Sequence, residues 1–147
     1  PKRNGLPMEG RYHYRVTLAL AGATLIAPIV TGDVRALAMT AGALTGLVVE
    51  PDLDVDHRTH SENLVYRHAG KAIGTLWQLY WYPYALILPH RHKLSHSPIL
   101  STIIRALYLL APAIAVWAWQ GWPVPWAILG YWLGGLALVD LGHIILD

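Results

Sequence analysis

Three short segments of this chain carry most of the side chains that could hold a divalent metal ion. They are residues 51–57 (PDLDVDH), 89–96 (PHRHKLSH) and 140–147 (DLGHIILD). Imidazole nitrogens and carboxylate oxygens are ligands of zinc, manganese and iron. The chain has no cysteine, so a thiolate site is excluded and a metal would need His, Asp or Glu. The segments lie far apart in sequence, so this chemistry depends on a fold that brings them together.

The acidic segment follows an apolar run, and its carboxylates alternate at Asp52, Asp54 and Asp56. In an extended segment alternate side chains point the same way, so these carboxylates could line one edge. A helix C-terminus disfavours negative charge, which suggests that a cation compensates; a solvated acidic turn is the alternative. An EF-hand calcium loop also begins with alternating Asp, but His57 and Asn63 replace its glycine and its final glutamate. We therefore set the calcium loop aside.

The histidine segment offers two imidazoles in either of two conformations. His92 and His96 share a face if the segment is helical, whereas His90 and His92 share a side if it is extended. Either pair could bind a metal. The alternative is a basic loop, with Arg91 and Lys93, that touches anionic lipid headgroups.

The last predicted helix carries Asp140, His143 and Asp147 on one face, at spacings of three and four residues. Ionisable residues within an apolar run are costly and usually face the protein interior or water. Capping of the final turn is the alternative, but only the histidine is favoured at a helix C-terminus. The remaining histidines are weaker candidates, and we retain His57 alone among His13, His57, His60 and His68.

The composition predicts an integral membrane protein. Hydrophobic residues make up 54% of the chain and charged residues 14%, where a soluble domain averages about 25% charged. Four apolar runs, at 16–31, 34–49, 99–119 and 124–146, are predicted spans, and Gly32-Asp33 is a predicted tight turn between the first two. We expect an all-α fold: a four-helix membrane bundle in a single domain over residues 1–147. The alternative is a soluble bundle with buried helices.

Residues 72–89 form a separate aromatic element. One face of the predicted helix carries Trp77, Tyr80, Trp81, Tyr84 and Leu88. Its tyrosines, glutamine and proline make it a poor spanning helix, so we predict an additional interfacial or re-entrant helix. A fifth span is the alternative, and it would place the acidic and histidine segments on opposite sides of the membrane.

With four spans, all three donor segments lie on one side of the membrane. Most basic residues lie on that side too: Lys2, Arg3, Arg11, Arg15, Arg58, Arg67, Lys71, Arg91 and Lys93. Arg35 alone lies on the other side, and Arg105 lies inside the third span. The positive-inside rule then predicts a multi-pass protein of the inner membrane whose metal site faces the cytoplasm.

Four motifs carry a resemblance to a known family. PDLD at 51–54, residues 81–91, LSHSP at 94–98 and HIILD at 143–147 resemble a family of uncharacterised bacterial metal-binding membrane proteins. More remotely, their order is similar to that of membrane-bound metal-dependent hydrolases. The resemblance covers roughly residues 40–147. It implies a metal held by Asp52, Asp54, His90, His96, His143 and Asp147, and it establishes no substrate.

The leading hypothesis is a metal-dependent hydrolase that acts on a lipid or phosphoester at the cytoplasmic face. One or two Zn, Mn or Fe ions would activate water, with Asp56 or His57 as the general base. An anionic substrate group would be held by Arg58, Arg91 and Lys93. The alternative is a small non-catalytic subunit of a larger membrane complex, with a structural metal and a Trp/Tyr-rich surface against lipid or pigment. The net charge of +2, without a basic stripe, argues against nucleic acid as a partner.

Overall fold

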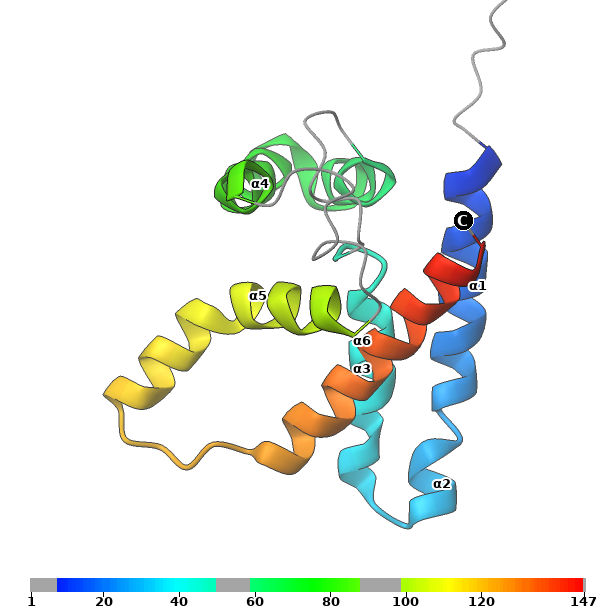
Figure 1. The fold of residues 1–147 in the computed structure, drawn as a ribbon, viewed down its shortest axis with the longest axis vertical. Helices are drawn as coiled ribbons and strands as arrows, with labels where there is room; N and C mark the ends of the chain where they lie inside the picture. The colour runs from blue at the N-terminus through cyan, green and yellow to red at the C-terminus, as the bar shows by residue number, and fades with distance from the viewer. Residues whose placement is uncertain (1–7, 50–58, 88–98, 147) are drawn as a thin grey trace, which may run out of the picture.

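The structure is a computed structural model that describes residues 8–49, 59–87 and 99–146. The described residues form helices and no strand, which confirms the all-α prediction for this part of the chain (Figure 1). The elements are α1 (Met8–Thr24), α2 (Ala27–Thr31), the 3-10 helix η1 (Val34–Ala36), α3 (Leu37–Thr45), α4 (His60–Ile87), α5 (Leu100–Trp119) and α6 (Trp126–Leu146).

Three helical stretches within the described residues are long and apolar enough to cross a membrane: Tyr12–Thr31, Leu100–Trp119 and Trp126–Ile145. The predicted span at 34–49 contains only a shorter apolar stretch, Val34–Thr45. At about 1.5 Å per residue this stretch is about 18 Å long, short of a hydrocarbon core of about 30 Å. The predicted four-helix membrane bundle is therefore not confirmed. Helix α4 has 28 residues but is not among the helices apolar enough to count as candidate spans, and whether residues 72–89 lie at the interface stays a prediction.

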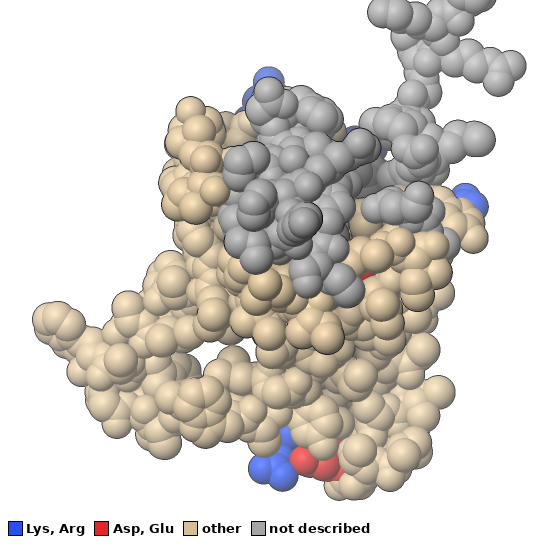
Figure 2. Space-filling model, in the orientation of Figure 1, with Lys and Arg blue, Asp and Glu red and all other residues tan. Residues whose placement is uncertain are grey.

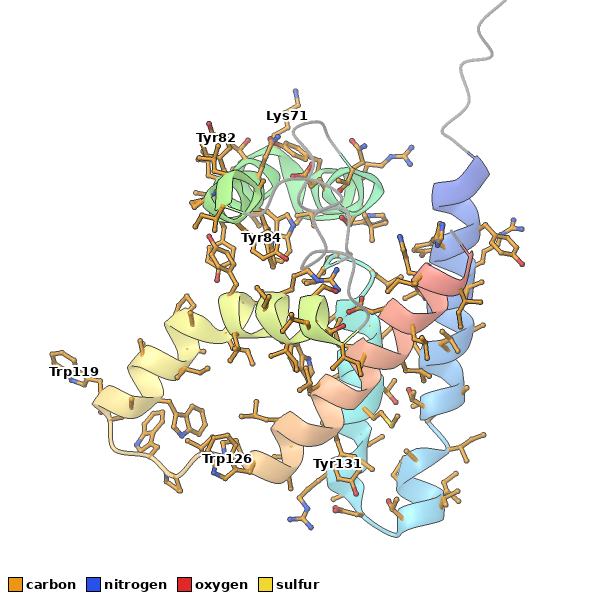
Figure 3. All side chains as sticks on the ribbon, viewed as in Figure 1. Lys71, Tyr82, Tyr84, Trp119, Trp126 and Tyr131 are labelled. Carbon is orange, nitrogen blue, oxygen red and sulfur yellow. The ribbon has the colours of Figure 1, made fainter. Side chains whose placement is uncertain are left out.

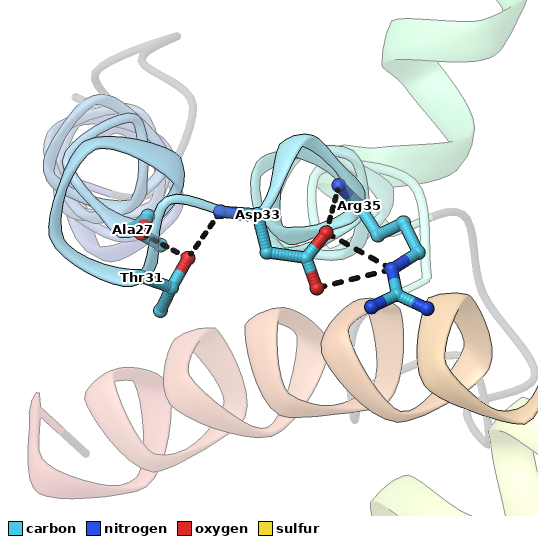
Figure 4. Close-up of polar contacts among 4 residues, drawn as sticks. All are labelled: Ala27, Thr31, Asp33 and Arg35. Atoms are coloured by element: carbon cyan, nitrogen blue, oxygen red, sulfur yellow. Dashed lines mark hydrogen bonds and ion pairs between the residues drawn. The ribbon is translucent and has the colours of Figure 1, made fainter.

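The tight turn predicted at Gly32-Asp33 is present between α2 and η1. Gly32 has a φ of 65°, a left-handed conformation that glycine adopts without a Cβ clash. The Thr31 hydroxyl donates to the Ala27 carbonyl at 2.8 Å and accepts from the Asp33 N–H at 3.2 Å (Figure 4). The Asp33 carboxylate caps η1 by accepting from the Arg35 N–H at 2.9 Å and also pairs with its side chain. The side-chain hydrogen bond from Arg35, with its backbone hydrogen bond second, lowers the pKa of Asp33.

Helices α1, α3 and α6 pack side by side, and α3 contacts α6 at the level of the backbone (Figure 1). A Cβ atom on Gly42 of α3 would lie 1.8 Å from the Trp132 carbonyl oxygen, and one on Gly135 of α6 would lie 1.8 Å from the Met39 carbonyl oxygen. Small residues permit such close approach of helices in lipid. The centre of this three-helix group is a buried cluster of Ala21, Ala43 and Val139.

Helix α4 begins with a capping box. The Thr59 hydroxyl accepts from the Glu62 N–H at 3.2 Å, and the Glu62 carboxylate accepts from the Thr59 N–H at 3.1 Å. The helix is interrupted at Gly70, where φ is 87° and ψ is 168°, so the aromatic half that follows can turn against α5.

The aromatic face of α4 packs against the protein. Trp81 and Tyr84 are buried together with Val49. Tyr80 donates its hydroxyl to the Tyr108 carbonyl at 2.6 Å, and Tyr108 donates to the Tyr80 carbonyl at 2.7 Å. Pro112 lacks the N–H that would bond the Tyr108 carbonyl within α5, so the phenol of Tyr80 satisfies that carbonyl instead. Burial, with Tyr108 as a second cause, raises the pKa of Tyr80.

Much of the outer surface of the described residues is apolar. Figure 2 shows charged side chains only in small patches on the visible face. Several large apolar side chains are more than half exposed, including Ile29 (80%), Val30 (77%), Trp119 (89%) and Trp126 (75%). Figure 3 shows Tyr84 on the side of α4 that faces α5, and Lys71 on the opposite side. Apolar surface of this extent on span-length helices fits association with a membrane.

Candidate functional site

Two histidines from opposite ends of the chain meet where α1 and α6 pack together. The rings of His13 and His143 are stacked, with centroids 4.1 Å apart and an interplanar angle of 29°. His143 is 9% exposed. Helix α6 runs antiparallel to α1, so its last turns lie beside the first turns of α1. We call this place the α1–α6 end. It is the one position in the described structure where two predicted or candidate histidines come together.

A buried ion pair joins α5 to α6. The Arg105 Nη2 atom lies 2.5 Å from the Asp140 Oδ2 atom, and the Thr102 hydroxyl donates to the same oxygen. Arg105 is 0% and Asp140 1% exposed. Both residues lie within span-length helices, where a lone charge would be very costly. Asp140 shares a helical face with His143, as the spacing predicts, but within the described structure its carboxylate neutralises an arginine.

The other predicted site residues lie outside the described residues. These are the metal ligands Asp52, Asp54, His90, His96 and Asp147, the general-base candidates Asp56 and His57, and the substrate-binding residues Arg58, Arg91 and Lys93. Of the predicted ligands, His143 alone is described. Within the described part of the chain, no three His, Cys, Asp or Glu side chains form a group that could hold a metal ion.

The donors at the α1–α6 end have the right chemistry for a transition metal but supply only part of a ligand set. Two imidazoles are half of the four ligands that zinc commonly takes. Mixed imidazole and carboxylate donors suit Zn, Mn or Fe(II). His13 and His143 therefore fit such an ion if carboxylate or further imidazole donors join them.

Comparison with known protein families identifies the family to which the chain belongs. Residues 8–138 match the family described as uncharacterized metal-binding protein (DUF2227). The chain belongs to this family. The match contains His13, Thr102 and Arg105, whereas Asp140 and His143 follow its last residue. No curated protein and no solved structure matches the chain.

Membership in this metal-binding family supports a metal as the cofactor, and the family description names neither the metal nor a reaction. The structure adds three residues that the sequence interpretation did not select: His13, Thr102 and Arg105. Arg105 and Asp140 are opposite charges inside two neighbouring apolar runs, and this signal indicates that each charge needs a partner without indicating which one. His13 lies just before the first apolar run, on the same predicted side of the membrane as His143, and nothing else in the sequence distinguishes it from the other lone histidines.

Proposed function

We propose that this member of the metal-binding family is a multi-pass membrane protein that holds a divalent ion at the α1–α6 end. The stacked pair of His13 and His143 carries the proposal, because it brings two imidazoles from distant parts of the sequence to one place. The remaining ligands would come from Asp52, Asp54, His90, His96 and Asp147. Zn, Mn or Fe, as one ion or two, suits this donor set.

The proposed site faces the cytoplasm from the inner membrane. The Gly32-Asp33 turn, with Arg35, lies at the opposite end of the α1–α3 hairpin from His13. Most Lys and Arg residues belong to segments assigned to the side of His13. Under the positive-inside rule, this bias favours the cytoplasm for the α1–α6 end.

The proposed activity is hydrolysis of a lipid or another phosphoester. A divalent ion in the site would lower the pKa of its water toward about 7 and polarise a phosphoryl oxygen. Asp56 or His57 would accept the proton from that water, and Arg58, Arg91 and Lys93 would hold the anionic group of the substrate. A site at a membrane surface favours a lipid or lipid-linked substrate.

A second candidate is a non-catalytic subunit of a larger membrane complex. The observation that favours it is the exposed aromatic surface: Trp119 is 89%, Trp126 75% and Tyr82 59% exposed (Figure 3). Such side chains suit contacts with lipid headgroups or with a partner protein. In that case the ion would join the helix ends and take no part in chemistry.

Elemental analysis of the purified protein tests the metal site. The wild type is expected to retain about one or two transition-metal ions per chain, and His143→Ala is expected to lose most of them, because even the loss of a residue that only supports a ligand typically lowers metal affinity by about 10–100-fold. His68→Ala is the matched control, since His68 is exposed and bonds the Leu64 carbonyl. Equal metal content in the wild type and in His143→Ala would contradict the proposal.

The two functional candidates separate on the same preparations. Metal-reloaded wild type should hydrolyse a phosphoester and lose this activity in His143→Ala while His68→Ala stays active. The non-catalytic subunit would be favoured if the protein binds metal, hydrolyses none of a broad panel of phosphoesters and copurifies stably with other membrane proteins.

A further inference from the structure

The guanidinium of Arg105 has a donor that the ion pair does not use. Its Nη2 atom binds Asp140, and its Nε atom donates to the Ser101 carbonyl at 3.4 Å. Its Nη1 atom is buried and has no hydrogen-bond partner among the described residues. The bond to Ser101 places the guanidinium back along α5, beside the first turn of that helix.

A second buried donor lies one helical turn away. Ser101 is 0% exposed, and its hydroxyl has no hydrogen-bond partner within the described part of the chain. Ser101 and Arg105 are four residues apart and therefore share a face of α5. Burial of polar groups without a partner is unfavourable, so two such groups on one face indicate a ligand that accepts hydrogen bonds from both.

The electrostatics at this place favour an anion. The first N–H groups of a helix have no partner within it, and the helix dipole places roughly +0.5 charge at that end. Ile99, at the cap of this 20-residue helix, provides no side-chain acceptor. Asp140 neutralises Arg105, which allows the guanidinium to be buried while Nη1 stays available.

We propose that Ser101, Arg105 Nη1 and the N-terminal turn of α5 form a binding site for a phosphate group. Phosphate oxygens accept several charge-assisted hydrogen bonds, and arginine is well suited to donate them. The proposal rests on the proposed function in that the phosphate would belong to the phosphoester substrate. A lipid headgroup and a soluble phosphate compound share this chemistry.

Inorganic phosphate is the first probe, titrated at constant ionic strength against the full chain in nanodiscs of phosphatidylcholine. Phosphate should raise the midpoint of thermal unfolding of the wild type, as expected for a ligand of the folded state. Arg105→Met combined with Asp140→Leu removes both buried charges and should weaken phosphate binding by about tenfold or more. Ser101→Ala should weaken it by a smaller factor. The matched control is Arg35→Met with Asp33→Leu, which removes an exposed pair and should leave binding unchanged.

Arg105→Lys keeps the positive charge but loses the planar guanidinium group, so it tests the role of Arg105 even if the double variant does not fold. It should also bind phosphate more weakly than the wild type. The proposal is overturned if phosphate does not stabilise the wild type, or if it stabilises the wild type, Ser101→Ala and the folded Arg105 variants equally.

Nanodiscs that contain phosphatidic acid distinguish the two sources. If phosphatidic acid stabilises the protein through Arg105 and added phosphate does not displace it, the ligand is a lipid headgroup. If inorganic phosphate alone stabilises the protein, the ligand is a soluble compound.

Elemental analysis of the same variants separates this inference from the metal proposal. Arg105-dependent phosphate binding by a wild type that holds no metal would refute the metal site and leave the phosphate site standing. A wild type that retains metal but does not bind phosphate would refute the phosphate site and leave the metal site standing.

Discussion

The pair of Arg105 and Asp140 shows how single residues constrain this protein. Each charge lies inside a span-length helix, and each is almost fully buried. Either one alone would cost several kcal/mol in an apolar environment, whereas together they are neutral, and the Asp140 carboxylate also accepts a hydrogen bond from the Thr102 hydroxyl. Sequence alone indicates that both charges need partners. It does not indicate that Arg105 and Asp140 pair with each other and not with other charged groups, because the partner of each depends on how α5 packs against α6.

Breaking one half of this pair should be worse than removing both halves. Arg105→Met is expected to destabilise the protein by about 3–5 kcal/mol, because it leaves the Asp140 carboxylate buried without its cation. Adding Asp140→Leu should recover most of that loss. Unfolding in mild detergent micelles, followed by circular dichroism, measures both, with Arg35→Met as the exposed control. If the double variant were as unstable as the single one, packing rather than charge would be the cause.

At the scale of elements, the sequence predicted the turns and the long helices well. The Gly32-Asp33 turn and the two C-terminal span-length helices appear close to the predicted residues. The bundle was less predictable because residues 46–49 are apolar, and composition does not reveal that α3 ends at Thr45. The aromatic face of α4 was ambiguous for another reason. Trp and Tyr suit both a membrane interface and a protein core, so only packing against Tyr108 and Val49 decides its orientation.

The contact of α3 with α6 makes a sharp prediction about two adjacent glycines. A Cβ at Gly135 would collide with the backbone of Met39, whereas one at Gly134 meets nothing within 4 Å. Gly135→Ala should therefore destabilise the protein by about 1–3 kcal/mol or more, since backbone cannot move aside as a flexible side chain can. Gly134→Ala should be neutral or slightly stabilising, because alanine favours helix over glycine by about 1 kcal/mol.

Thermal unfolding of the two variants in the same detergent measures this difference. Both add one methyl group at neighbouring helical positions, so lipid or detergent effects on α6 should be nearly equal. Equal unfolding midpoints for the two variants would mean that α3 and α6 do not approach as closely as the structure shows.

At the scale of the whole molecule, the described residues bring together one histidine pair that the sequence interpretation did not select. His13 and His143 meet at the α1–α6 end, although the sequence interpretation favoured His57 over His13. Counting spans could indicate which ends share a side of the membrane. It could not indicate which side chains touch there, because that depends on the register of α1 against α6. The acidic and histidine segments lie outside the described residues, and their place in the site stays a prediction.

The assignment of sides can be tested directly because the chain contains no cysteine. Arg35→Cys places a thiol at the Gly32-Asp33 turn, and Lys71→Cys places one on the outer side of α4 (Figure 3). A maleimide that cannot cross membranes, added outside intact cells or spheroplasts, should label Arg35→Cys and leave Lys71→Cys unlabelled. Permeabilised cells are the control, in which both variants should react. Labelling of both variants from outside would refute the placement of these two regions on opposite sides of the membrane. Labelling of Lys71→Cys alone would keep them on opposite sides but would place the metal site away from the cytoplasm.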